Sequence, residues 1–254
     1  MFLILLHIPH VSQKKGGVHK RGIVGFLFFF LFFFFFWFLF YFILLLNFNF
    51  FLRSFQWKGA FAVTFQLWFM SVVHICRHGQ DEDNFEGLLN GRRDRPLTQL
   101  GREQASTLAQ KLKERGMTYD IILTSPLKRA NETARIIGEA LSVHVETENE
   151  LVEREFGVLT GKPIAQIRAY AGENVVQGDK VLYFLSVDGA ETFDECYDRA
   201  ARVLHRVDTT FAGKRVLLVC HGDIGKMLLA VKKKITWREG IMLPYFDNTS
   251  VLET

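Results

Sequence analysis

The first 69 residues of this 254-residue chain contain no aspartate and no glutamate, although the whole sequence has 27 of them. The same segment holds 20 of the 26 phenylalanines and six of the 31 lysines and arginines. Residues 70–254 therefore carry 27 acidic and 25 basic side chains, a net charge of −2. Because the positive total belongs to the N-terminal segment, the sequence excludes nucleic acid as the partner of the remainder.

Cysteine is also scarce, with three residues that form no CxxC pair and no metal-ligand spacing. An odd number of cysteines does not favour a disulfide framework. Cys76 and Cys220 stand near the ends of apolar runs, which favours reduced thiols buried in a core. No cluster of aspartate and histidine indicates a metal, so we expect neither metal nor cofactor.

The N-terminal segment allows two interpretations, which stay open. Residues 22–46 are 25 residues without a charge, long enough for a helix that crosses a bilayer. The flanking basic residues would then leave residues 70–254 outside a single-pass membrane anchor. Alternatively, the phenylalanine bias marks a low-complexity segment. Phenylalanine has T-rich codons, so such a segment would arise if T-rich DNA upstream of a true start at Met70 were translated. We favour the start at Met70, which predicts a cytoplasmic protein with residues 1–69 as a spurious extension.

Residues 70–254 alternate apolar runs typical of strands with helical patterns, which predicts one α/β domain with a mainly parallel sheet. Thr98 caps one predicted helix that ends at Gly116, and another opens with Ser125 as N-cap and Pro126 at its first position. Expected strands cover residues 71–76, 119–125, 144–147, 214–220 and, as an edge strand, 248–254.

Two of these strands end in the same way. The run VVHIC leads into Arg77, His78 and Gly79, and the run VLLVC leads into His221 and Gly222. Ligands of parallel sheets bind at the carboxyl ends of the strands, so we expect these side chains to meet in one crevice.

Five motifs follow one another in a family order: RHGQDEDN, NGRRDRPLTQLGREQA, TSPLKRANETA, LVEREFG and CHGD. Together they resemble the histidine phosphatase superfamily over residues 71–254. The resemblance implies the phosphoglycerate mutase-like fold, a three-layer α/β sandwich with a mainly parallel central sheet.

The resemblance also implies a phosphate site made of Arg77, Asn84, Arg129 and His221. A phosphoryl group spreads negative charge over three oxygens, and the planar fork of a guanidinium matches that geometry. Asn84 adds a neutral donor, and we expect His221 to be protonated and to stabilise the charge of the transferring group.

His78 is implied as the nucleophile, which forms a phosphohistidine that water then hydrolyses. The nearby arginines disfavour its imidazolium form. Glu153 matches the family's proton donor, and its neighbour Glu155 is the alternative.

The favoured function is a metal-independent phosphomonoester hydrolase acting on a small phosphorylated metabolite. A phosphoglycerate mutase and a non-catalytic, membrane-tethered binding protein on the same fold remain alternatives. The mutases of this pattern carry an inserted arginine pair for the substrate carboxylate, whereas residues 161–188 contain only Arg168. Asp223 and Lys226 depart from the small residue and arginine of many relatives, and the sequence leaves the substrate and the oligomeric state undefined.

Overall fold

The computed structural model describes residues 71–253. The predicted span at 22–46 and the proposed start at Met70 lie outside this range. Among residues 71–253, no helix has the length and apolar character needed to cross a membrane.

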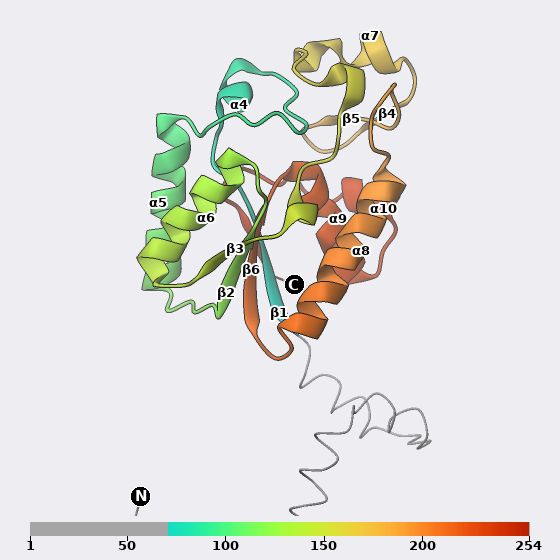
Figure 1. Ribbon diagram of the computed structural model, residues 1–254. Coiled ribbons are helices and arrows are strands. Elements are labelled where there is room, and N and C mark those ends of the chain that lie inside the picture. The colour runs from blue at the N-terminus through green and yellow to red at the C-terminus, as the bar shows by residue number, and fades with distance from the viewer. Residues whose placement is uncertain (1–70, 254) are drawn as a thin grey trace, which may run out of the picture. The chain divides into compact units, whose positions relative to one another are not determined.

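A five-stranded sheet forms the centre of the domain, in the order β3-β2-β6-β1-β7 (Figure 1). Strands β1, β6, β2 and β3 are parallel, and only the edge strand β7 runs against its neighbour β1. The mainly parallel sheet and the C-terminal edge strand were both predicted from the sequence and are confirmed; the antiparallel direction of β7 comes from the structure. The strands are β1 (Val72–Arg77), β2 (Ile121–Thr124), β3 (Val145–Thr147), β6 (Arg215–Cys220) and β7 (Val251–Glu253).

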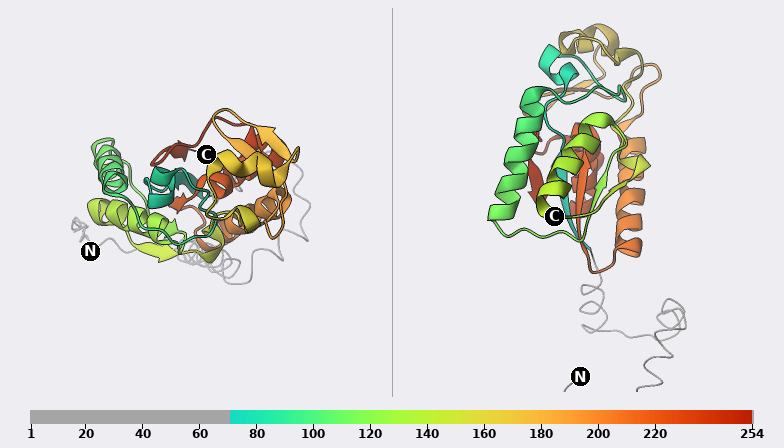
Figure 2. Two further views of the ribbon diagram at one scale, coloured as in Figure 1. Left: turned by 90° about the horizontal axis from the view of Figure 1, so that it is seen from above. Right: turned by 60° about the vertical axis from the view of Figure 1, so that its left-hand side comes forward.

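Helices cover both faces of the sheet and make the expected three layers (Figures 1 and 2). Side chains along β6 alternate between the layers: Leu218 and Cys220 pack in one buried cluster, and Leu217 and Val219 in another. A strand that is buried on both faces has little need of polar residues, which explains the continuous apolar run. One layer holds α5 (Gln99–Glu114) and α6 (Lys128–Leu141), and the other holds α8 (Phe193–Thr210), α9 (Gly222–Lys233) and α10 (Trp237–Ile241).

The helix ends match the sequence signals except at α6. Thr98 accepts a hydrogen bond from the backbone N–H of Gly101, and Gly116 has the positive φ of 65° that ends a helix well. The prediction that Ser125 caps α6 is wrong, because the helix begins three residues later, at Lys128, and has no side-chain cap. Ser125 instead points toward His221, as described below.

A smaller lobe lies over the carboxyl ends of the parallel strands (Figure 1). The chain between β3 and α8 includes an antiparallel β-hairpin whose two strands have three residues each. The lobe has its own small core, which contains Phe156, Leu159 and Phe184. Its elements are α4 (Glu82–Glu86), η2 (Gly157–Leu159), η3 (Ile164–Gln166), α7 (Ile167–Ala171), β4 (Val175–Gln177) and β5 (Leu182–Phe184); η1 (Asn149–Leu151) precedes it.

The cysteines are buried as the sequence predicts, and three histidines outside the predicted site differ in burial. The three cysteines are buried free thiols. His74 is buried in β1, with Nδ1 2.9 Å from the Tyr119 hydroxyl, and His144 and His205 are exposed. None of these residues belongs to the site described next.

Candidate active site

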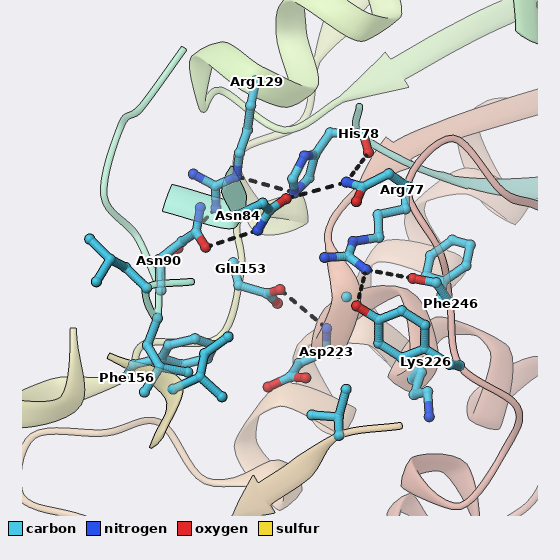
Figure 3. Close-up of a pocket in the computed structure, with 18 of the residues that line it drawn as sticks. Arg77, His78, Asn84, Asn90, Arg129, Glu153, Phe156, Asp223, Lys226 and Phe246 are labelled. Atoms are coloured by element: carbon cyan, nitrogen blue, oxygen red, sulfur yellow. Dashed lines mark hydrogen bonds between the residues drawn. The ribbon is translucent and has the colours of Figure 1, made fainter. Parts of the chain in front are cut away.

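A cavity of about 280 Å³ opens between the carboxyl ends of the strands and the smaller lobe. Its wall contains five of the six predicted site residues: Arg77, His78, Asn84, Arg129 and Glu153 (Figure 3). The sixth, His221, is fully buried and its ring centroid lies 5.0 Å from that of His78. The structure therefore brings together residues that are up to 144 positions apart in the sequence.

His78 follows β1 directly, and its hydrogen bonds define its tautomer. Nδ1 lies 2.6 Å from the carbonyl oxygen of Gly79, which only accepts, so Nδ1 carries the proton. Nε2 is left with its lone pair, which accepts a hydrogen bond from Arg129 Nε at 3.3 Å. Burial, followed by the charges of Arg129 and Arg77, holds the pKa of His78 well below its usual range. The side chain is a neutral imidazole with an unprotonated Nε2.

Arg129 is held rigidly from the first turn of α6. Its two Nη atoms donate to the carbonyl oxygens of Arg93 and Gly91, at 2.6 and 2.9 Å. Its Nε lies 3.2 Å from the buried carboxylate of Asp81, and it also donates to Nδ1 of His221 at 3.1 Å. A guanidinium fixed in this way needs little reorganisation to bind an anion beside His78.

Arg77 is a buried cation that has a hydrogen-bond donor to spare. Nη1 donates to the Tyr245 hydroxyl at 2.9 Å and to the carbonyl oxygen of Phe246 at 2.7 Å. Its Nε has no partner, and no carboxylate within residues 71–253 forms an ion pair with it. Leaving a buried donor unpaired is costly, so this group is suited to an anionic ligand.

Asn84 lies in a chain of three asparagine side chains. Its Nδ2 donates to Asn90 at 3.2 Å, and its Oδ1 accepts from Nδ2 of Asn248 at 3.3 Å. Asn248 also donates to the carbonyl oxygen of His78 at 2.9 Å, which connects the segment before β7 to this residue. Sequence reasoning missed both: Asn90 opens the second motif but was given no role there, and Asn248 stands in no motif.

Glu153 faces the cavity with its carboxylate at the N-terminus of α9 (Figure 3). Oε1 accepts from the backbone N–H groups of Arg154 and Ile224, and Oε2 accepts from that of Asp223. Burial, followed by the charge of Asp223, raises the pKa of Glu153 above its ordinary value. A carboxyl group whose pKa is raised holds its proton to a higher pH than an exposed one, which suits a proton donor.

Glu155, the alternative proton donor, lies away from this cavity. Its Oε1 accepts from the backbone N–H of Phe156 at 3.0 Å, from that of Gly157 at 3.4 Å and from the Thr160 hydroxyl at 3.2 Å. It also pairs with Arg92 at 3.8 Å on an open surface. The carboxylate therefore closes a turn of the smaller lobe.

His221 is bonded through both ring nitrogens. Nδ1 accepts from Arg129 Nε, and Nε2 lies 2.8 Å from Ser125 Oγ, so the proton resides on Nε2. We expected an imidazolium here, but burial and the charge of Arg129 hold the pKa of His221 well below its usual range. In the free site His221 is neutral and orients Arg129.

The two positions that depart from the family pattern differ in their contacts. Lys226 is buried, and its Nζ donates to the carbonyl oxygens of Ile241 and Leu243 at 2.9 and 2.7 Å. Oδ2 of Asp223 accepts a hydrogen bond from Arg154 Nε at 2.8 Å. Both residues contribute to the cavity wall.

Comparison with known proteins agrees with the geometry. The family model described as histidine phosphatase superfamily (branch 1) matches residues 73–254. The chain is 32% identical over 153 residues to the uncharacterized phosphatase PhoE of Bacillus subtilis, covering 60% of this chain and 72% of that protein. It is 30% identical over 178 residues to a 2,3-bisphosphoglycerate-dependent phosphoglycerate mutase of Parvibaculum lavamentivorans, covering 68% of this chain and 85% of that one.

Solved structures show the same fold. A mycobacterial glucosyl-3-phosphoglycerate phosphatase in complex with VO3 matches with a TM-score of 0.62 and 26% identity, over 71% of this chain and 89% of that one. The YhfR protein of Bacillus stearothermophilus matches with a TM-score of 0.61 and 26% identity, again over 71% of this chain and 89% of that one. The match of the family model over residues 73–254 shows that the chain belongs to the histidine phosphatase superfamily.

Proposed function

We propose that this enzyme is a metal-independent phosphomonoester hydrolase that works through a phosphohistidine on Nε2 of His78. One observation carries the proposal: the hydrogen bond from Nδ1 to the Gly79 carbonyl leaves Nε2 unprotonated, with a lone pair that accepts from Arg129 at the wall of the cavity. Arg77, with its unpaired Nε, and Asn84 complete the donors for a phosphoryl group.

In the first step, Nε2 of His78 attacks phosphorus and the bond from phosphorus to the ester oxygen breaks. Glu153 gives its proton to the departing alkoxide and becomes a carboxylate. The positive charge on the phosphorylated ring is met by the Gly79 carbonyl oxygen, which accepts from Nδ1. Arg77 and Arg129 stabilise the charge on the transferring oxygens.

In the second step, water attacks phosphorus from the side that the alcohol has left. The Glu153 carboxylate takes the proton of that water, the bond from nitrogen to phosphorus breaks, and inorganic phosphate is released. Neutral His78 and protonated Glu153 are restored, so the cycle needs no further reactant. His221 and Ser125 keep Arg129 in place throughout.

Hydrolysis is favoured over a mutase reaction by the cations that line the cavity. A mutase must also hold a substrate carboxylate, but Arg77 and Arg129 face the phosphoryl position and Lys226 is turned to two carbonyl oxygens. Arg168, which could have bound a substrate carboxylate, is exposed on α7 and does not line the cavity.

The test is hydrolysis of p-nitrophenyl phosphate by the purified full chain in mild detergent, with a chelator present. We expect turnover to survive chelation and to be lost in His78→Ala. A His78→Ala protein as active as the parent would refute the proposal, and loss of turnover on chelation would refute its metal independence.

A further inference from the structure

The wall of the cavity beyond the phosphoryl position carries an acidic group that has a free oxygen. We propose that Asp223 selects substrates whose leaving alcohol is uncharged and bears hydroxyl groups, as in sugar and polyol phosphates, and rejects those that bear a carboxylate. This inference rests on the proposed hydrolase function, and it concerns the part of the substrate that the phosphate ligands do not touch.

The Asp223 carboxylate is anchored from behind by a buried arginine. Arg154 is 1% exposed, donates from Nε to Oδ2 at 2.8 Å, and has its guanidinium carbon 4.1 Å from the Phe184 ring centroid and 4.2 Å from that of Phe193. Since Arg154 does not line the cavity, a substrate meets the carboxylate and not the cation that balances it.

The second oxygen of Asp223 is free to accept. Oδ1 has no hydrogen-bond partner in the part of the chain that the structure describes, and Figure 3 shows the carboxylate beside Glu153 at the cavity. Glu153 is the proposed donor to the ester oxygen, so Oδ1 is placed to meet a group of the leaving alcohol that lies further from phosphorus. A hydroxyl donates to a carboxylate, whereas a second carboxylate is repelled by it.

Tyr183 provides a second free polar group. Its side chain lines the cavity and is 5% exposed, yet its hydroxyl makes no hydrogen bond with any residue in the range 71–253. The ring is fixed by Phe193, with centroids 5.9 Å apart, and by Lys226 Nζ, 5.1 Å from its centroid. A hydroxyl held in this way is suited to exchange hydrogen bonds with an uncharged polyol.

Among the described residues that line the cavity, every basic side chain is already engaged elsewhere than with a substrate carboxylate. Of the basic residues that line the cavity, Arg77 and Arg129 serve the phosphoryl group. Nζ of Lys226 is committed to two carbonyl oxygens next to the C-terminus of α10. The similar mutases and the mycobacterial phosphatase are named for phosphoglycerates. The substrate preference that this wall gives the present enzyme would therefore differ from theirs.

The experiment measures kcat/KM of the full chain for sn-glycerol 3-phosphate and for 3-phospho-D-glycerate, which differ chiefly in a hydroxymethyl group against a carboxylate. Their ratio within one protein cancels changes in the shared phosphoryl chemistry. We expect the wild type to favour the glycerol ester at least about tenfold, the scale of one hydrogen bond to a charged group. Asp223→Asn should reduce the ratio about tenfold, and Tyr183→Phe should reduce it severalfold.

The control is Asp188→Asn, which removes an exposed acid that does not line the cavity and should leave the ratio unchanged. A wild type that prefers the phosphoglycerate overturns the proposal, even if Asp223→Asn fails to fold. An Asp223→Asn protein that hydrolyses p-nitrophenyl phosphate but keeps the wild-type ratio also overturns it. If the wild type hydrolyses none of the three esters, the proposed function itself has failed.

Discussion

Replacing Glu153 by glutamine removes the proposed proton donor while nearly keeping its shape. The amide cannot protonate the ester oxygen, and general acid catalysis contributes about 10²–10⁴-fold. We therefore expect kcat/KM for an alkyl phosphate to fall by that factor, equivalent to about 3–5 kcal/mol of transition-state stabilisation. For p-nitrophenyl phosphate, whose leaving group departs without a proton, the loss should stay within about tenfold.

The structure also predicts the side effects of this substitution. Two of the three backbone hydrogen bonds can persist on the amide oxygen, but the amide nitrogen would face the N–H of Asp223. Two donors in contact should reduce the free energy of unfolding by about 1–3 kcal/mol. Because the pKa of Glu153 is raised, the wild-type rate on an alkyl phosphate should fall as pH rises through that pKa, and the variant should lose this limb.

The assay is steady-state kinetics with both esters, since kcat/KM reports only the steps through formation of the phosphoenzyme. Glu155→Gln is the matched control, because that carboxylate closes a turn outside the cavity. It should change the rates for both esters by the same small factor. Equal losses for the two esters in Glu153→Gln would refute the assignment of the proton donor.

Three further outcomes are expected. Ser125→Ala leaves Nε2 of His221 without a partner. The free energy of unfolding should fall by about 1–3 kcal/mol, and kcat/KM should fall by about tenfold. Unchanged kinetics and denaturation would contradict the role given to Ser125 and His221. The folded protein holds the pKa values of His78 and His221 low, so the unfolded chain binds more protons below pH 6.5 and stability should fall on acidification. The loss is about 1.4 kcal/mol per histidine at pH 5.5. Denaturant titration of Glu153→Gln checks it, because this variant lacks one of the two carboxyl groups whose raised pKa opposes the trend, Asp81 being the other; a flat profile would contradict it. Finally, mass spectrometry of the endogenous protein should find no peptide from residues 47–69 if translation starts at Met70, and one such peptide would refute that start.

The sheet and most of the site could be predicted because their signals are local. An apolar strand that ends in Arg77 and His78, and another that ends in His221, place three groups at one edge of a parallel sheet before any tertiary contact is known. The order of the motifs then extends the set to Arg129 and Glu153. Arg77, His78 and His221 stand at strand ends that the sequence marks, whereas Arg129 and Glu153 are found through the motif order alone.

The residues that were missed depend on contacts between distant segments. Asn248 and Tyr245 come from the stretch before β7, and only the pairing of β7 with β1 brings that stretch to His78 and Arg77. The β4–β5 hairpin has strands of three residues each, too short for an alternating pattern to be visible.

Ser125 shows how a sound local signal can mislead. Serine before proline is typical of a helix N-cap, but α6 starts later and the hydroxyl is taken by His221. The protonation of His221 was wrong for a similar reason, because the sequence does not reveal that the ring is fully buried against Arg129. Both errors concern groups whose partners lie far away along the chain.

The central claim is a covalent phosphoryl group on Nε2 of His78, and rapid quenching tests it most directly. The full chain is mixed with a phosphate ester labelled on phosphorus, stopped in alkali within milliseconds, digested and mapped by mass spectrometry. We predict an acid-labile phosphoryl group on the peptide that contains His78, enriched in Glu153→Gln with p-nitrophenyl phosphate because the activation of water is impaired. A label on another residue, or its persistence in His78→Ala, would contradict the account.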